Sequence, residues 1–150
     1  MKKFALAAVA AASMFCAGAQ AYTTGIFSNG FVVPNVIHNG PSDTTAVGII
    51  SKDNSANQRP IYWTFFDQNS NHVTDGCFVV THNDYEPFVW SERSGTGLEG
   101  KRGYLVFSVG SSPAPGATTC PLTSAPGLGA GFPGNPGIAG SAFQVNLTNK

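Results

Sequence analysis

The fold is decided by a run of six residues, Ile61-Tyr62-Trp63-Thr64-Phe65-Phe66. β-branched and aromatic side chains predominate in this run, and these residue types favour extended strands. Apolar side chains lie on both of its alternating faces, which is typical of a central strand covered on two sides. The run Tyr104-Leu105-Val106-Phe107 shows the same pattern. We therefore expect sheets at the centre of this protein.

Similar short runs recur along the chain between turn signals, and no stretch after residue 21 keeps the 3.6-residue period of a helix. The expected strands are Gly25–Ser28, Phe31–Val33, Val36–His38, Thr45–Ser51, Ile61–Asp67, Cys77–Thr81, Pro87–Trp90, Tyr104–Val109 and Ala142–Leu147. This arrangement predicts an all-β fold, specifically an antiparallel two-sheet sandwich.

Three dipeptides indicate tight turns between the strands: Asn29-Gly30, Asn39-Gly40 and Asp75-Gly76. Asn, Asp and Gly tolerate the positive φ that a two-residue hairpin turn requires. A turn at Asp75-Gly76 would pair Thr74 with Cys77.

The last expected strand alternates apolar with polar residues. Phe143, Val145 and Leu147 alternate with Gln144 and Asn146. Because successive side chains of a strand point to opposite faces, the pattern predicts that the three apolar residues face the core. Such a strand suits an outer position in a sandwich.

The first 21 residues have the features of a secretory signal peptide. Lys2 and Lys3 precede the apolar stretch Phe4–Ala12, which is too short to cross a bilayer, and Ala19-Gln20-Ala21 supplies the small residues of a cleavage site. We predict a signal peptide over residues 1–21, cleavage after Ala21, and a single domain over residues 22–150. No transmembrane anchor is expected after cleavage.

Charge is scarce and excludes some partners. Removing the signal leaves six of the eight basic residues and all eight acidic ones, so the mature chain is mildly acidic. Nucleic acid would need a concentrated basic surface, and we expect none as a partner. The expected partner is a surface or a protein ligand whose identity the sequence does not specify.

Two cysteines, Cys77 and Cys120, remain in the mature chain. Exported proteins meet an oxidising compartment in which such a pair forms a disulfide, and the spacing is not the C-x-x-C of redox or metal sites. We predict a Cys77–Cys120 bond and a location in the periplasm, at the cell surface or outside the cell.

Residues 110–140 form a long loop rich in glycine and proline within the domain. Loops of this length in compact domains are usually functional or disordered. Cys120 would tether the loop to the strand that carries Cys77. The loop is therefore a candidate binding element, with a segment that has no partner as the alternative.

A cation site is predicted from the Asp75-Gly76 turn. That turn would place Asn69 opposite His82 and Asp67 opposite Asp84 on one sheet face, and two opposed carboxylates are unfavourable unless a positive charge lies between them. We expect that Asp67, Asn69, His82 and Asp84 could hold calcium or zinc. Carboxylates that splay into water are the alternative.

Residues Gly95-Thr96-Gly97-Leu98-Glu99-Gly100 match the G-x-G-x-x-G spacing of a dinucleotide fingerprint. The fingerprint requires a helix directly after the glycines, whereas here a strand is expected at Tyr104. We expect a glycine-rich connection and no organic cofactor. The flanking basic residues Arg93, Lys101 and Arg102 favour at most weak capture of an anion such as a sugar acid.

A tryptophan, Trp90, lies between Cys77 and Cys120, as in immunoglobulin domains. However, Thr118 stands where those domains carry a tyrosine, two residues before the second cysteine. We therefore expect an immunoglobulin-like architecture without membership of that family.

The leading functional hypothesis is an exported, non-catalytic β-sandwich that serves as a cell-envelope or extracellular binding or structural component. A first alternative is a metal-dependent binding protein or small hydrolase that uses the Asp67–Glu86 region, where His82, Asp84 and Glu86 cluster beside Tyr85. A second alternative is a small outer-membrane β-barrel of eight strands.

Overall fold

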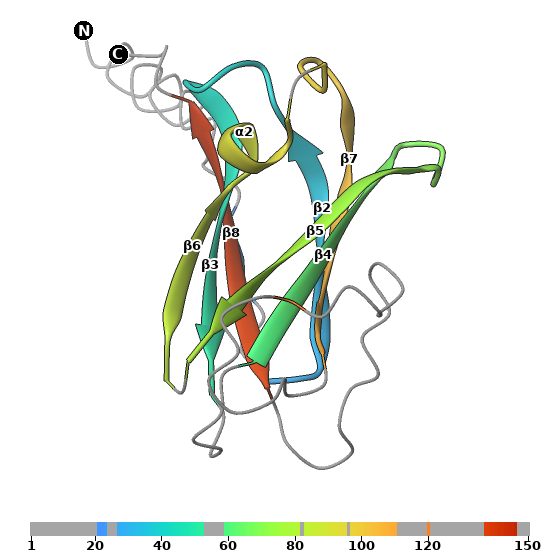
Figure 1. Ribbon diagram of the computed structural model, residues 1–150. Helices are drawn as coiled ribbons and strands as arrows, with labels where there is room; N and C mark the ends of the chain where they lie inside the picture. The colour runs from blue at the N-terminus through green and yellow to red at the C-terminus, as the bar shows by residue number, and fades with distance from the viewer. Residues whose placement is uncertain are drawn as a thin grey trace, which may run out of the picture.

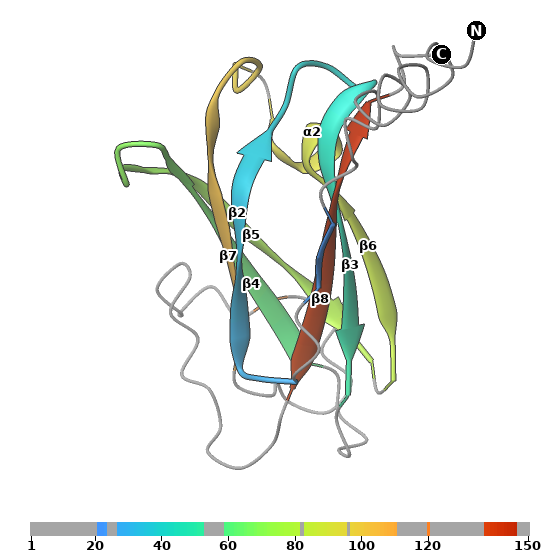
Figure 2. The same ribbon diagram turned by 180° about the vertical axis from the view of Figure 1, so that it is seen from behind.

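The computed structural model describes residues 21–23, 27–52, 59–81, 83–95, 97–110, 120 and 137–146. These residues form eight strands and one helical turn, and the strands pair as two antiparallel four-stranded sheets that pack face to face (Figures 1 and 2). The predicted all-β sandwich is confirmed. The described strands form two separate sheets and not the single closed sheet that the barrel alternative required.

Each sheet combines strands from distant parts of the chain. Sheet A has the order β1 (Ala21–Thr23), β8 (Ile138–Asn146), β3 (Asp43–Ser51) and β6 (Tyr85–Val89). Sheet B has the order β2 (Gly30–Ile37), β7 (Arg102–Val109), β4 (Arg59–Asp67) and β5 (His72–Val80). The helical turn α2 (Trp90–Arg93) follows β6 directly.

The strand order is related to that of an immunoglobulin domain. There, the second and fifth strands pair in one sheet and the third and sixth in the other. If β2 is counted as the first strand, β3 and β6 are the second and fifth strands, and they pair. β4 and β7 are then the third and sixth strands, and they pair in the other sheet. Three strands differ: β8 lies beside β3 where the first immunoglobulin strand would be, β2 lies beside β7 where the last would be, and β5 pairs with β4 and not with β6.

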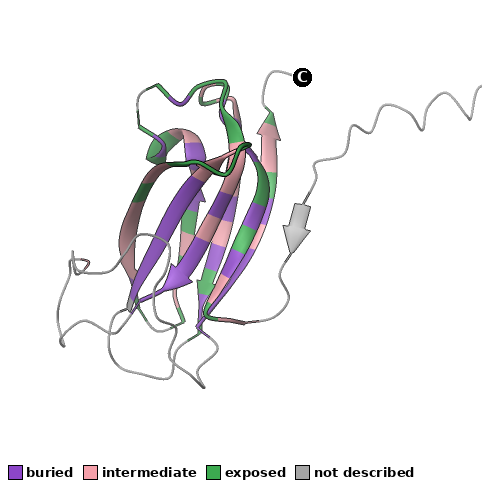
Figure 3. Cartoon of the chain, turned by 90° about the vertical axis from the view of Figure 1, so that its right-hand side faces the viewer, coloured by how far each residue is buried: buried purple, intermediate pink, exposed green. Residues whose placement is uncertain are grey.

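Aromatic side chains fill the space between the sheets. The Trp63 ring on β4 makes edge contacts with Phe88 on β6 and with Trp90 at centroid distances of 5.6 and 5.8 Å. Phe88 also meets the edge of Phe107 on β7 at 5.0 Å. Such pairs each stabilise a core by about 0.5–1.5 kcal/mol beyond their apolar burial. Figure 3 shows buried residues alternating with exposed ones along the strands.

The strand that decides the fold is central, as predicted. β4 lies between β7 and β5, and every residue from Ile61 to Phe65 is buried. Trp63 points into the core, so its neighbour Tyr62 points to the outer face of sheet B, where the ring packs against Pro60 and Gly110.

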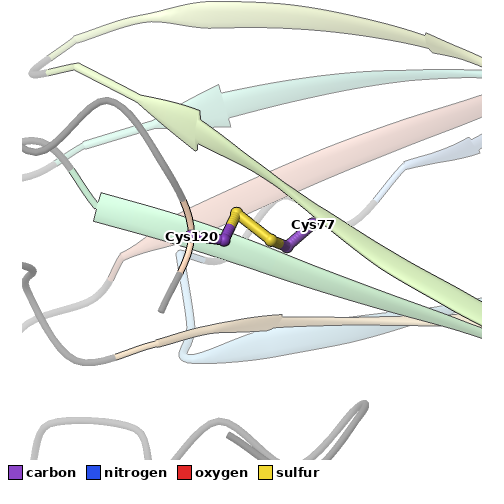
Figure 4. The surroundings of a disulfide bond; sticks show 2 residues. All are labelled: Cys77 and Cys120. Carbon is purple, nitrogen blue, oxygen red and sulfur yellow. A yellow bond between two sulfur atoms is a disulfide. The ribbon is translucent and has the colours of Figure 1, made fainter. Parts of the chain in front are cut away.

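The predicted disulfide is confirmed. Cys77 lies opposite Tyr62 in β5, and its bond to Cys120 holds that residue against sheet B (Figure 4). The rest of the glycine- and proline-rich loop, residues 111–119 and 121–136, lies outside the described residues.

The predicted turn at Asp75-Gly76 is wrong, because β5 runs straight through these residues. Gly76 pairs with Trp63, and a Cβ atom at Gly76 would lie 2.6 Å from Cζ2 of the indole ring. The glycine is required by the close approach of Trp63 and not by a turn. The β4–β5 hairpin turns at residues 68–71 instead.

The hairpin predicted at Asn29-Gly30 is also wrong, since Ser28 pairs with Ile138 of sheet A, whereas Gly30 begins β2 and pairs with Ser108 of β7 in sheet B. β2 joins the two short strands expected on either side of Pro34. It accommodates this proline because it is an edge strand with a register shift between Val33 and Val36. The chain turns near Asn39-Gly40 as predicted, but the turn spans residues 39–43 between His38 and Thr44 and is not a two-residue hairpin, with Gly40 at φ 94°.

The predicted buried face of the last strand is wrong. Ala142 points into the core and Phe143 points outward, 43% exposed. Two core positions of β8, Gly140 and Ala142, carry small residues, and a Cβ atom at Gly140 would overlap the Phe31 ring. Leu147 lies outside the described residues.

Residues 1–20 lie outside the described residues, so the signal peptide remains a prediction. β1 begins at Ala21, and cleavage after that residue would leave Tyr22 and Thr23 paired with β8. In the described part of the chain, no helix is both long and apolar enough to span a membrane.

The disulfide should stabilise the fold substantially. It closes a loop of 43 residues, for which the loss of chain entropy in the unfolded state corresponds to about 4 kcal/mol. The double variant Cys77→Ser/Cys120→Ser should lose about this much unfolding free energy in urea titrations. Dithiothreitol should lower the midpoint of the natural protein but not that of the double variant. Equal urea midpoints for the natural protein and the double variant, both measured without dithiothreitol, would contradict the assignment.

The contact between Gly76 and Trp63 should make β5 sensitive to one added methyl group. Gly76→Ala should lower the unfolding free energy by about 1–3 kcal/mol, since the methyl group overpacks the indole ring. The neighbouring variant Asp75→Ala removes an exposed contact of 2.9 Å with His72 and should change it by less than about 1 kcal/mol. Equal losses in the two variants would show that the indole contact does not set the cost.

Candidate functional site

The residues of the predicted cation site are not brought together. Asp67 and Asn69 lie at the tip of the β4–β5 hairpin, whereas Asp84 lies in the turn between β5 and β6, at the other end of β5 (Figure 1). Nine residues of strand separate these positions by on the order of 25 Å. His82 lies outside the described residues. The predicted register was wrong because it depended on the Asp75-Gly76 turn.

Asp67 instead organises the hairpin turn. Its carboxylate accepts hydrogen bonds from the backbone N–H groups of Asn69 and Asn71, at 2.8 and 2.9 Å, and from the Asn71 side-chain amide at 3.1 Å. The backbone and side-chain bonds from Asn71 lower the pKa of Asp67, because they favour the charged form. They also support Ser70 in its left-handed conformation, at φ 62°.

The other carboxylates of the Asp67–Glu86 region are likewise engaged. Asp84 accepts hydrogen bonds from the Thr81 backbone N–H and hydroxyl, at 3.1 and 3.2 Å. Glu86 forms an ion pair of 2.9 Å with Arg93 of α2. Among the residues that the structure describes, no three His, Cys, Asp or Glu side chains are grouped so that they could hold a metal ion.

The Arg93 side chain contacts aromatic rings of both sheets. Its guanidinium lies over the rings of Phe78 on β5 and Phe88 on β6, 5.6 and 5.8 Å from their centroids. The guanidinium therefore has partners within the fold, namely these two rings and the carboxylate of Glu86. The predicted role of Arg93 in capturing an anion therefore has no support in its contacts.

Among the residues that the structure describes, the outer face of sheet A carries no charged side chain. Val47, Ile49 and Phe88 point into the core, so the residues that alternate with them along β3 and β6 point away from it. The outward residues of β3, β6 and β8, which we call the uncharged face, are Thr44, Ala46, Gly48 and Ile50 on β3, Tyr85, Pro87 and Val89 on β6, and Ala139, Ser141, Phe143 and Val145 on β8.

Large apolar side chains on this face reach solvent. Tyr85 is 61% exposed and lies opposite Ile50, which is 47% exposed. The Tyr85 ring lies over Gly48, because a Cβ atom there would be only 3.0 Å from its Cε2 and hydroxyl atoms. Phe143 lies two strands away, beside Ala46. The glycine thus lets an aromatic ring lie along the sheet.

A hollow of about 640 Å³ opens at the end of the sandwich that carries α2. Three segments meet there: the β2–β3 connection, α2, and the glycine-rich connection before β7 (Figure 2). The described residues that line it are His38, Pro41, Val89, Ser91, Glu92, Gly95, Gly97 and Glu99.

The glycine motif therefore forms one wall of a hollow, which sequence reasoning missed. Gly95, Gly97 and Gly100 all have positive φ, of 73°, 87° and 79°, as expected for a tight connection and not for the start of a helix. The motif spacing reveals the tight connection, but the residues opposite it, such as His38, come from a different part of the chain. The charged residues described at the hollow, Glu92 and Glu99, are acidic, which disfavours the anion expected from the sequence.

Comparisons with known proteins assign no family. No protein-family model, no curated protein and no solved structure matches the chain.

The hydrogen bonds to Asp67 should make the stability of the hairpin depend on pH. A pKa that is lower in the folded protein adds stability above the pKa of the unfolded chain, and this stability is lost as the pH falls through the folded-state pKa. Asp67→Asn should thus be less stable than the natural protein at pH 7. The difference in urea unfolding free energy should shrink below about pH 4. A difference that grows in acid would contradict this role.

Proposed function

We propose that the protein is an exported, non-catalytic binding or structural component of the cell envelope or extracellular space, and that it acts through the uncharged face of sheet A. The observation that carries the proposal is the exposure of Tyr85, Ile50 and Phe143 on a face with no charged residue at its described positions. Exposed apolar patches of this kind usually mark interaction sites.

The chemistry of the face favours a neutral, flat partner surface. Burial of a charge against such a partner would be costly, and this face presents none. Tyr85 combines a large apolar ring with a hydroxyl group, and tyrosine is enriched at binding surfaces for that reason. Its ring is held along the sheet over Gly48, so little flexibility is lost on binding.

The disulfide and the predicted signal peptide support the exported location, because disulfides persist in oxidising compartments. The engagement of Asp67, Asp84 and Glu86 in turns and an ion pair supports a non-catalytic role for their region. The outer face of sheet B is a weaker candidate for binding, since the disulfide holds part of the chain against it.

The location and the face can be tested in one experiment. The full chain should be expressed in a bacterium with its own signal, and the cytoplasm, periplasm, envelope and medium analysed by intact mass. We expect a processed chain that begins at Tyr22, contains the disulfide, and is recovered in part with the envelope. An unprocessed cytoplasmic protein would contradict the export proposal.

Variants of the exposed aromatic residues test the face. Tyr85→Ser/Phe143→Ser should reduce the fraction that sediments with washed envelope fragments at least tenfold, because each interface aromatic contributes about 1–2 kcal/mol. Val32→Ser is the matched control, since Val32 is 53% exposed but lies on β2 in the other sheet. Equal retention of both variants would refute a role for the uncharged face.

A further inference from the structure

We infer that the hollow beside α2 is a binding site for a neutral saccharide, that is, an uncharged ring with several hydroxyl groups. The inference rests on the lining of the hollow and is independent of the partner proposed for the uncharged face. Val89 belongs to both surfaces, whereas the polar residues of the hollow lie outside the face.

A buried histidine supplies a fixed donor. His38 lines the hollow although only 5% of it is exposed. Its Nδ1 accepts the backbone N–H of Gly40 at 3.2 Å, so the proton of the neutral ring is on Nε2, which can donate to a ligand oxygen. The backbone around it is held as well, because the His38 carbonyl accepts the Gly100 N–H at 2.7 Å.

Two carboxylates supply acceptors. Glu92 on α2 and Glu99 in the glycine-rich connection line the same hollow, and both are exposed. Carboxylates only accept hydrogen bonds, so the ligand must bring donors, and they disfavour an anion. Hydroxyl groups satisfy both requirements, because each donates to a carboxylate and also accepts from a donor such as His38. A simple amine would leave the histidine donor unused.

The remaining walls fit a sugar ring. Pro41 and Val89 provide apolar surface for the C–H groups of such a ring. Gly95 and Gly97 have no side chains, so the backbone is open to a close ligand, and a Cβ atom at either position would meet nothing within 4 Å. A volume of about 640 Å³ lies within the usual range of roughly 300–1,000 Å³ for small-molecule sites.

α2 is positioned for this role by the fold. Trp90 is fully buried in the core, and the Ser91 N–H donates to the Thr44 hydroxyl of β3 at 3.0 Å. The ion pair between Arg93 and Glu86 fixes the other end of the turn. Glu92 therefore projects from a short segment that is held at both ends.

The test is a nuclear magnetic resonance titration of the processed, disulfide-bonded protein. The probes are N-acetylglucosamine, its β-1,4-linked dimer and cellobiose, with glucuronate and arginine amide as charged comparisons. We expect at least one neutral sugar to give saturable shifts of the Gly95 and Gly97 amides. The double variant Glu92→Ala/Glu99→Ala should weaken that binding at least tenfold. The control variant Asp75→Ala, which removes an acidic side chain from the distant strand β5, should leave the binding unchanged.

Three results would overturn the inference. The first is the absence of shifts at these amides for all three neutral sugars up to their solubility limits. The second is binding of glucuronate or arginine amide that is as tight as that of the best neutral sugar. The third is an equal loss of binding in Asp75→Ala. None of these results depends on envelope retention, so the inference and the proposed function can fail separately.

Discussion

The packing of Trp63 between the two sheets is the constraint on which the rest of the structure depends. Its ring meets Phe88 of the opposite sheet and Trp90 of α2, and Gly76 of the neighbouring strand lies so close that no larger residue fits without movement. This close approach requires β5 to run straight past Trp63, and the β4–β5 hairpin consequently turns at Asp67. The same contact holds Trp90 in the core, which fixes α2 and with it one wall of the hollow.

Sequence patterns predicted the features that depend on local composition. The apolar run at Ile61–Phe66 identified the central strand, and two cysteines in a predicted exported chain identified the disulfide. The errors arose where a glycine serves a distant partner. Asp75-Gly76 has the composition of a turn, but its glycine makes room for Trp63. In β8, Phe143 faces outward because Phe31 occupies the core space beside Gly140.

The candidate sites could not be predicted for a related reason. The cation site depended entirely on the register set by a turn at residues 75–76. Because the turn lies at residues 68–71, Asp67 and Asp84 are at opposite ends of β5. The hollow, by contrast, combines His38 with residues more than fifty positions later in the chain, and their proximity depends on which strands pair. The glycine motif was visible in the sequence, whereas the side chains that give its hollow a chemical character were not.

The outer faces of the two sheets differ in what lies on them. The disulfide holds Cys120 against sheet B, while sheet A presents Tyr85 and Phe143 to solvent. This difference depends on the straight course of β5 past Trp63, which nuclear Overhauser contacts measure most directly. The account predicts strong contacts between the Gly76 Hα protons and the Trp63 indole, with ring-current shifts of those protons. Contacts typical of a turn between Thr74 and Cys77, without any from Gly76 to the indole, would contradict it.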